Sequence, residues 1–290
     1  MSVDESNQLA RRFEENRRHL RSVAYRMLGS LSEADDAVQE AWLRLSRSDA
    51  GGIDNLGGWL TTVVARVCLD MLRARRARAE GPSAVHIPDP TISSDTGREA
   101  ILADSVSLAL LVVLETLAPS ERLAFVLHDL FDLPFEQIAP IVGKTPAAAR
   151  QIASRARRRV RGSSTPADAD LGAQQEVVAA FLAAARSGDF DALLRVLDPE
   201  VVVRGDLGPT SSVVRAGAEH AAKGAIEGAR LTATTQRVLV NGAPGYVSFD
   251  ASGEPRAVLA FTVRQGKITE INLLADPDRF RQLGLPNAPR

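Results

Sequence analysis

The sequence predicts a multidomain protein in which two all-α helical domains are followed by an α+β domain. Apolar residues recur at helical spacing over residues 9–78 and again over residues 99–161. After Leu171 the pattern changes to β-branched runs separated by Gly-containing turn dipeptides. With 290 residues, the chain is also longer than one ordinary domain.

The composition indicates a globular protein of a reducing compartment. Hydrophobic residues make up 45% of the chain and charged residues 24%, and the formal net charge is −1. Cys68 is the only cysteine, and its apolar neighbours predict a buried thiol rather than a nucleophile. The chain shows neither a signal peptide nor a run long enough to span a bilayer, so we expect a soluble cytoplasmic protein.

Residues 1–80 form the first predicted domain, with helical segments at 11–28, 32–45 and 58–78. The breaks between these segments are the Gly29–Ser30 step and a polar run at 47–58. Residues 81–98 are rich in Pro, Ser and Asp and lack periodicity, which predicts a flexible linker.

The second helical segment carries an unusual polar face, and Ser32 and Asp35 predict a capping box at its start. At about 100° per residue, one face is apolar and contains Ala34, Ala37, Val38, Ala41 and Leu45. The opposite face contains Asp36, Gln39, Glu40 and Leu43, with Asp35 and Trp42 at its flank. An exposed Leu and Trp among acids indicate a protein partner with apolar and basic patches. A charged surface with an incidental leucine remains the alternative.

The third helical segment has a polar stripe and a strongly basic end. Thr62, Arg66, Asp70 and Arg73 share one face, and the segment ends in "RARRAR". Together with the basic helix described next, the basic end of this segment predicts a protein that binds DNA through two separate helices. An ordinary ion pair between Arg66 and Asp70, and a helix-dipole role for the terminal arginines, stay open.

Residues 99–162 form the second predicted domain, which contains a helix-turn-helix over "LPFEQIAPIVGKTPAAARQIASRARRRV". Pro134 suits the first turn of a helix, and Pro140 inside that helix should bend it. Gly143 provides the turn, and Thr145 followed by Pro146 predicts the N-cap and first residue of the second helix.

The second helix of this motif is cationic on one side only. Between Gln137 and Ala167 there is no Asp or Glu. The apolar stripe contains Ala149, Ile152, Ala156 and Val160, and the opposite face contains Arg150, Ser154, Arg157, Arg158 and Arg161. A DNA major groove accepts such a helix, with arginines for guanine edges and phosphates. A merely solvated Arg-rich face is the alternative, although acids would normally be interleaved there.

A second linker is predicted at 163–170, and residues 171–290 form the α+β domain. A helical hairpin hinged at Gly188 precedes strands that are separated by turns at Asn241–Gly242, Ser252–Gly253 and Gln265–Gly266. We expect helices against one curved antiparallel sheet. An enzyme would need an acid or base in an apolar pocket, and the titratable candidates are Asp206, Asp250 and His220. His19, His86 and His128 lack metal-ligand spacing, so neither a metal nor another cofactor is expected.

The helical part resembles a known family. "ADDAVQEAWLRL", "WLTTVVARVCLDMLRARRAR" and the helix-turn-helix segment are similar to regions 2 and 4 of sigma-70 factors of the extracytoplasmic-function (ECF) group. The resemblance covers residues 9–162, and it implies a promoter-specificity subunit of bacterial RNA polymerase rather than an enzyme. By that resemblance the linker would run toward the RNA exit path, where its acids could mimic nucleic acid.

The resemblance also implies site residues. Core polymerase, through its β′ clamp helices, would contact Asp35, Asp36, Gln39, Glu40 and Leu43, and region 4 would meet the β flap. The −10 element would contact Asp54, Asn55, Trp59, Arg66, Asp70, Arg73, Arg75 and Arg76. The −35 element would contact Thr145, Arg150, Gln151, Ser154, Arg155, Arg157 and Arg158. ECF factors commonly have Asn where this chain has Val67, and valine cannot hydrogen-bond a base.

Residues 171–290 resemble the SnoaL-like, NTF2-like cone that SigJ-like sigma factors carry as a regulatory extension. The group's Trp-Leu-Pro-Glu-Pro linker motif is replaced here by "HIPDP", and its Asp-Gly-Gly-Gly-Lys loop by "RGDLGPTSS". Asp276, Pro277 and Asp278 match its Asn-Pro-Asp-Lys-Leu element more closely. Two other readings stay open: a helix-turn-helix regulator with a ligand-sensing cone, and an enzyme in the cone. Whether the cone holds a small-molecule ligand is also left open.

Overall fold

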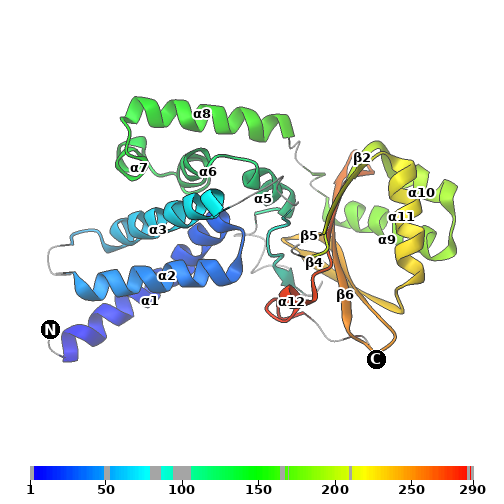
Figure 1. The fold of residues 1–290 in the computed structure, drawn as a ribbon, viewed down its shortest axis with the longest axis horizontal. Helices are drawn as coiled ribbons and strands as arrows, with labels where there is room; N and C mark the ends of the chain where they lie inside the picture. The colour runs from blue at the N-terminus through cyan, green and yellow to red at the C-terminus, as the bar shows by residue number, and fades with distance from the viewer. Residues whose placement is uncertain are drawn as a thin grey trace. The chain divides into compact units, whose positions relative to one another are not determined.

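The structure is a computed structural model that describes residues 3–48, 53–78, 86–93, 106–163, 167–168, 170–208, 211–285 and 288. The chain divides into two compact units (Figure 1). The first unit comprises Met1–Gly81 and Val113–Ser163, and the second comprises Pro82–Val112 and Ser164–Arg290. The predicted fold class, helical domains followed by a sheet-rich cone, is confirmed.

The described residues of the first unit form helices joined by short turns. Its elements are α1 (Val3–Leu28), α2 (Leu31–Arg47), α3 (Leu56–Arg78), α6 (Pro119–Phe125), the π-helical η2 (Val126–Leu130), α7 (Phe135–Val142) and α8 (Pro146–Ser163), while α5 (Leu108–Glu115) spans the boundary between the units. Helices α1, α2 and α3 pack on one another, and α3 also contacts α6 and α7. The packing is driven by apolar burial, because Leu20, Met27, Leu45 and Leu60 have no exposed surface.

Local signals predicted these helices with small differences. The N-cap of α2 is Ser30, whose Oγ accepts from the Glu33 N–H, so the predicted cap at Ser32 is two residues too late. Pro140 lies near the end of the short α7, which stops two residues later, before Gly143 at φ 68°. Cys68 is buried as predicted, and burial raises the pKa of its thiol far above the ordinary range.

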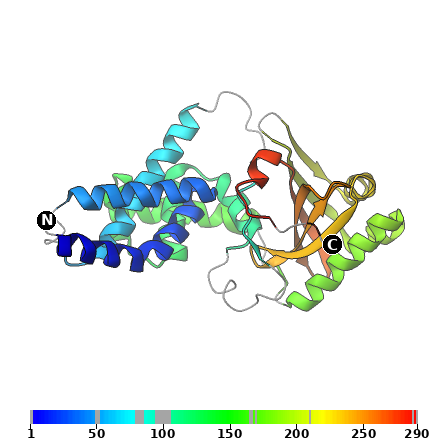
Figure 2. The same cartoon turned by 90° about the horizontal axis from the view of Figure 1, so that it is seen from below.

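The second unit is a curved sheet covered by helices on one face. Helices α9 (Leu171–Ser187), α10 (Phe190–Val196) and α11 (Ala218–Arg230) lie on one side of the strands, as the two views show (Figures 1 and 2). Phe181, Leu193, Ala222 and Phe261 belong to the core between them. Gly188, at φ 73°, ends α9 as the sequence predicts.

In the described part of the chain, seven strands form one sheet in the order β1-β4-β5-β6-β7-β2-β3. They are β1 (Ile92–Ser93), β2 (Leu197–Asp206), β3 (Ser212–Ala216), β4 (Thr234–Val240), β5 (Ala243–Phe249), β6 (Pro255–Arg264) and β7 (Lys267–Leu274), followed by the short α12 (Pro277–Phe280). The predicted turns are confirmed, with Asn241 and Gln265 at φ 50° and 51°, each followed by a left-handed glycine. The prediction of a purely antiparallel sheet is wrong, because β2 pairs with β7 in parallel.

Residues 86–93 do not behave as the flexible linker that their composition predicts. Ile92 and Ser93 form β1, which pairs with β4 at the edge of the sheet. Thr91 exchanges hydrogen bonds with Asn241, and Ile87 is only 1% exposed. A free sheet edge satisfies the backbone of an extended segment whatever its local propensity, which is why composition gave no signal.

Among the described helices, none has a stretch apolar enough to cross a bilayer.

Candidate functional site

The polar face predicted on α2 is present and open. Asp35, Asp36 and Gln39 are exposed, and the side of the helix facing the unit's interior consists of the buried Ala34, Ala37, Val38, Ala41 and Leu45. Leu43 is 38% exposed among these polar groups. Arg21 Nε donates to Asp35 Oδ1 at 2.6 Å, and Arg44 Nε donates to Glu40 Oε1 at 2.9 Å. The face therefore offers one apolar side chain ringed by carboxylates and an amide.

Trp42 contributes less to this face than the helical wheel suggests. Its ring packs against Phe13 with the ring centroids 5.1 Å apart, which leaves the side chain only partly exposed. Trp42 thus helps to hold α2 against α1.

The predicted DNA residues on α3 fall into two groups. Asp54, Arg66, Asp70, Arg73 and Arg76 are exposed, while Trp59 is half-buried. Asn55 caps the helix, because its Oδ1 accepts from the Gly58 N–H at 2.9 Å. Val67 is 6% exposed and packs inside the unit.

Arg75 lies apart from this exposed group. Its guanidinium donates to the Leu28 carbonyl and pairs with Glu33, and a weaker contact reaches Glu115 at 3.9 Å. It therefore links α3 to the end of α1 and the start of α2, with 35% of its side chain exposed.

Helix α8 has the predicted cap and the predicted apolar back. Thr145 Oγ1 accepts from the Ala148 N–H at 3.2 Å, and Ala149, Ile152 and Ala156 are buried. Val160, predicted in the same stripe, is partly exposed. The exposed polar face consists of Lys144, Thr145, Arg150, Gln151, Ser154, Arg155, Arg158, Arg159 and Arg161.

Three arginines of α8 are paired with acids that precede the helix in the sequence. Arg150 Nη2 donates to Glu136 Oε1 at 2.8 Å, Arg157 Nε to Asp129 Oδ1 at 2.5 Å, and Arg159 Nη1 to Glu121 Oε2 at 2.9 Å. The sequence pattern within the helix does not reveal these partners, because they lie 14, 28 and 38 residues before their arginines. The Arg157 side chain is 33% exposed, less than those of Arg150 and Arg159 at 56% and 57%.

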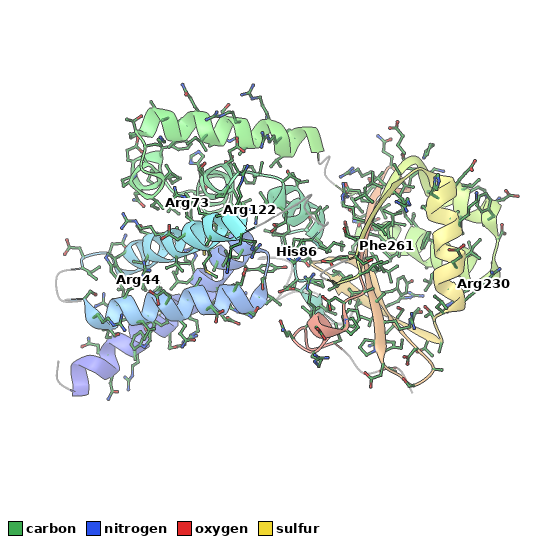
Figure 3. All side chains as sticks on the ribbon, viewed as in Figure 1. Arg44, Arg73, His86, Arg122, Arg230 and Phe261 are labelled. Carbon is green, nitrogen blue, oxygen red and sulfur yellow. The ribbon has the colours of Figure 1, made fainter. Side chains whose placement is uncertain are left out.

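Arg122 is a buried cation that the sequence analysis did not single out. It is 2% exposed and lies inside the first unit (Figure 3). Its Nη1 donates to the Met27 carbonyl at 2.9 Å and to Glu115 Oε1 at 2.8 Å, and its Nε donates to the Leu114 carbonyl at 2.8 Å. Phe131 adds a second link, with the Arg26 guanidinium 4.6 Å from its ring centroid. These contacts join α1 to the helices that carry α8.

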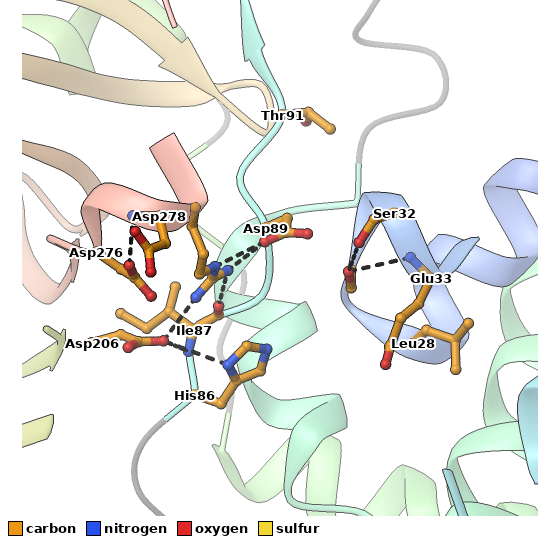
Figure 4. A network of polar contacts seen from close by, with 12 residues as sticks. Leu28, Ser32, Glu33, His86, Ile87, Asp89, Thr91, Asp206, Asp276 and Asp278 are labelled. Atoms are coloured by element: carbon orange, nitrogen blue, oxygen red, sulfur yellow. Dashed lines mark hydrogen bonds and ion pairs between the residues drawn. The ribbon is translucent and has the colours of Figure 1, made fainter. Parts of the chain in front are cut away.

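In the second unit, Arg279 of α12 binds the segment at 86–93. Figure 4 shows its partners Ile87, Asp89 and Asp206 close together. Its guanidinium donates to Asp89 Oδ1 at 2.6 Å, to the Ile87 carbonyl at 2.7 Å and to Asp206 Oδ2 at 2.8 Å. The Ile87 N–H also donates to Asp206 Oδ2 at 3.1 Å. The linker segment His86–Pro90, Asp206 at the start of the loop and Arg279 of the C-terminal element therefore meet in one network.

The charge of Asp206 depends on this network. Burial opposes its ionisation most strongly, but hydrogen bonds from His86, Ile87 and Gly208 and the charge of Arg279 outweigh burial, so the pKa of Asp206 lies below its ordinary value. A carboxylate with a lowered pKa stabilises the folded contact above its unfolded pKa of about 3.9, and this stabilisation is lost as the pH falls through the folded value.

We therefore expect the Ile87 amide to stay protected from exchange at neutral pH and to lose protection progressively as the pH falls below the unfolded pKa of about 3.9 and through the lower pKa of folded Asp206. Amide NMR across an acid titration measures this, with Val247 inside β5 as the internal reference for the sheet. Asp206→Asn cannot ionise, so it should show weaker protection at neutral pH and no acid transition. A transition that persists in this variant would assign the effect to another group.

The other two candidates for acid–base chemistry lie elsewhere. Asp250 accepts from Ser252 Oγ and from the Ser252 and Glu254 N–H groups, and these bonds lower its pKa in the β5–β6 turn. His220 is exposed on α11. The core of the cone is formed by apolar side chains and Tyr246. Gln175, Arg237 and Tyr246 line a cleft that has room for about one water molecule.

Three family models match the chain. Sigma-70 region 2 matches residues 12–78, Sigma-70 region 4 matches residues 107–160, and a SnoaL-like domain matches residues 178–271. The first two contain α2, α3 and α8 with their exposed faces, and the third contains most of the sheet.

Curated relatives match over nearly their full length. The probable ECF RNA polymerase sigma factor SigI of Mycobacterium tuberculosis is 38% identical over 273 residues, which cover 92% of this chain and 93% of the relative. The ECF RNA polymerase sigma factor SigJ of the same species is 38% identical over 288 residues, with 92% of each chain covered. The crystal structure of M. tuberculosis SigJ matches with a TM-score of 0.77 and 34% identity, covering 96% of this chain and all of that one.

Proposed function

Because this chain belongs to the ECF group of RNA polymerase sigma factors, we propose that α2 binds core polymerase and that α3 and α8 bind the promoter. We also propose that the second unit regulates core binding and promoter recognition. A sigma factor of this group binds RNA polymerase core and promoter DNA, so the chain acts where transcription occurs, in the bacterial cytoplasm. The conventional regulator considered above would need neither a region 2 nor the exposed face of α2.

The observation that carries the proposal is Leu43, exposed among Asp35, Asp36, Gln39 and Glu40. Such a face fits a partner that presents an apolar pocket with basic residues around it, and the β′ clamp helices are the proposed partner. Because the surrounding charges are solvated, the leucine provides most of the binding energy and the charges provide orientation and rate.

Leu43→Ala should therefore weaken binding to core polymerase by about tenfold or more, since an interface anchor contributes about 1.4 kcal/mol or more. Fluorescence anisotropy with labelled full-length protein and purified core enzyme measures the affinity. Leu231→Ala is the matched control, because Leu231 is 63% exposed and lies in the second unit. Equal affinities for the two variants would remove α2 from the core interface.

For the promoter, we propose that Arg66, Asp70, Arg73 and Arg76 of α3, with Asp54, Asn55 and Trp59 before them, meet the −10 element. The exposed face of α8 meets the −35 element. Arg75 stays in the proposed −10 group, with a side chain that is 35% exposed and pairs with Glu33 in the free protein. The basic end of α3 and the basic face of α8 supply phosphate contacts that the chain's near-zero net charge cannot.

Reading both elements requires the first unit to open. The two elements lie about 25 base pairs apart, or about 85 Å along the duplex at about 3.4 Å per base pair. The longest helix of the unit, α1, has 26 residues and spans only about 39 Å. Since α3 contacts α6 and α7, the elements that carry α8 must separate from α1, α2 and α3 before both sites are engaged.

We propose that the second unit regulates this opening through the segment at 86–93. This segment connects the two promoter-reading regions, and it is held by Arg279, Asp206 and the edge of β4. Asp89 is 7% exposed, so its carboxylate is unavailable to mimic nucleic acid until Arg279 releases it. The cone is accordingly a binding module for the linker, with no catalytic role assigned to Asp206 or Asp250.

A further inference from the structure

The acids that pair with α8 come from the elements that support it. Glu136 is the second residue of α7, and Asp129 belongs to η2. Their partners, Arg150 and Arg157, both lie among the residues proposed to read the −35 element. An acid beside a DNA-binding surface repels phosphate and therefore weakens DNA binding in general. Two such acids at this surface therefore need a second role to explain them.

Arg150 is held by two contacts at once. Besides its bond to Glu136, its guanidinium carbon lies 5.6 Å from the centroid of the Phe135 ring. Phe135 is 9% exposed, and its ring centroid lies 4.0 Å from that of His128. His128 Nδ1 in turn lies 2.9 Å from the Leu133 carbonyl oxygen. A fixed platform therefore lies beneath the guanidinium, whose side chain remains 56% exposed.

Arg157 is held by η2, the element that precedes α7. Asp129 accepts from its Nε at 2.5 Å, and the two side chains are 22% and 33% exposed. Asp129 lies in the π-helical turn, and the chain then reverses through Asp132 at φ 54°. π-Helical turns are rare and are often found at functional sites, and this one places a carboxylate against α8.

Arg155 and Arg158 differ from this pair. Both are exposed on the same helix, and neither has an ion-pair partner in the part of the chain that the structure describes. The four α8 arginines assigned to the −35 element thus divide into Arg150 and Arg157, which pair with carboxylates, and Arg155 and Arg158, which can follow phosphates; Arg159, which pairs with Glu121, and Arg161 are outside that set.

We propose that Glu136 and Asp129 are positioning residues that determine −35 specificity. They orient Arg150 and Arg157 for base edges and leave Arg155 and Arg158 to the phosphates. A guanidinium held in place loses less side-chain entropy on forming a bidentate contact with guanine. The same carboxylates repel the phosphate backbone of every DNA sequence. Only a site whose bases bind the oriented arginines overcomes this repulsion, so wrong sites are disfavoured. This inference rests on the proposed reading of the −35 element by α8.

The test uses holoenzyme formed from the full-length chain and core polymerase. A −35 duplex is first selected from a randomised pool by the unaltered holoenzyme, and a scrambled duplex serves as the non-specific site. Glu136→Gln should bind the scrambled duplex roughly threefold more tightly, because one repulsive charge is gone. Its ratio of specific to non-specific affinity should fall about tenfold, because Arg150 is no longer oriented. Asp129→Asn should act in the same direction.

Asp132→Asn is the matched control. It removes one negative charge from the same loop, Asp132 is exposed, and Asn tolerates its positive φ. Its specificity ratio should therefore stay within about twofold of the unaltered protein, because the charge is removed without changing the orientation of an arginine. Specific and non-specific affinities that fall together in Glu136→Gln, or an unchanged ratio, would overturn the inference.

The variant Arg150→Ala distinguishes the docking of α8 on the −35 element from the positioning role of Glu136. If its specificity ratio is unchanged, the docking of α8 on the −35 element fails. If its ratio falls while that of Glu136→Gln does not, the docking stands and only the positioning role is lost.

Discussion

Arg122→Met should destabilise the first unit by about 3–5 kcal/mol, the cost of removing one partner of a buried, hydrogen-bonded charge. The side chain is 2% exposed, and the Met27 and Leu114 carbonyls and Glu115 all accept from it. Methionine fills a similar volume but donates to none of them. The Met27 carbonyl and the Glu115 carboxylate would each lose a charged donor, and the Leu114 carbonyl would keep only its bond from the Leu117 N–H.

Tryptophan fluorescence during urea unfolding measures this loss directly. The chain has two tryptophans, Trp42 and Trp59, and both belong to the first unit, so the signal is not shared with the cone. Arg44→Met is the control, because its pair with Glu40 is solvent-exposed and should contribute less than about 1 kcal/mol. Equal midpoints for the two variants would show that Arg122 does not hold the unit together.

The same variant bears on the opening of the unit. Arg122 joins α1 to the elements that carry α8, and these elements must part before the two promoter sites can be engaged together. Below its unfolding midpoint, Arg122→Met should therefore open more readily than the unaltered protein.

Arg279→Met should release the segment at 86–93 and raise the exchange rate of the Ile87 amide roughly 100-fold, as expected when charge-assisted hydrogen bonds are lost. The loss of the guanidinium also leaves Asp89 and Asp206 as two buried carboxylates without their shared cation. Their mutual repulsion would push the segment off the cone.

Hydrogen exchange of the peptides covering 86–93 measures the release in the full-length protein. Arg281→Met is the control, since its side chain is 75% exposed and its pair with Asp278 is solvated. The pH dependence should also reverse: acid weakens docking in the unaltered protein, but in Arg279→Met protonation relieves the repulsion and favours docking. Unchanged exchange in Arg279→Met would mean that β1 alone holds the segment.

Promoter-dependent transcription should change in Arg279→Met and stay unchanged in Arg281→Met, because only the first variant frees the linker. This comparison is cleaner than removing residues 171–290. Such a truncation would also strip the surface against which Ile87 and β1 pack.

The sequence by itself determined the local structure and the family. Helical periodicity marked the buried and exposed sides of α2, and Thr145–Pro146 marked the start of α8, because caps and periodicity involve residues only a few positions apart. The turns at Asn241 and Gln265 followed from the preference of their dipeptides for positive φ.

Only the tertiary structure decided which charged groups are free. Arg122 meets Met27 across 95 positions and Arg279 meets Asp89 across 190, so no local pattern could pair them. The same holds for Arg75, which the resemblance groups with the −10 residues and which the fold pairs with Glu33. A charge can be buried only where another part of the chain supplies its partners, and which parts meet is fixed by packing rather than by composition.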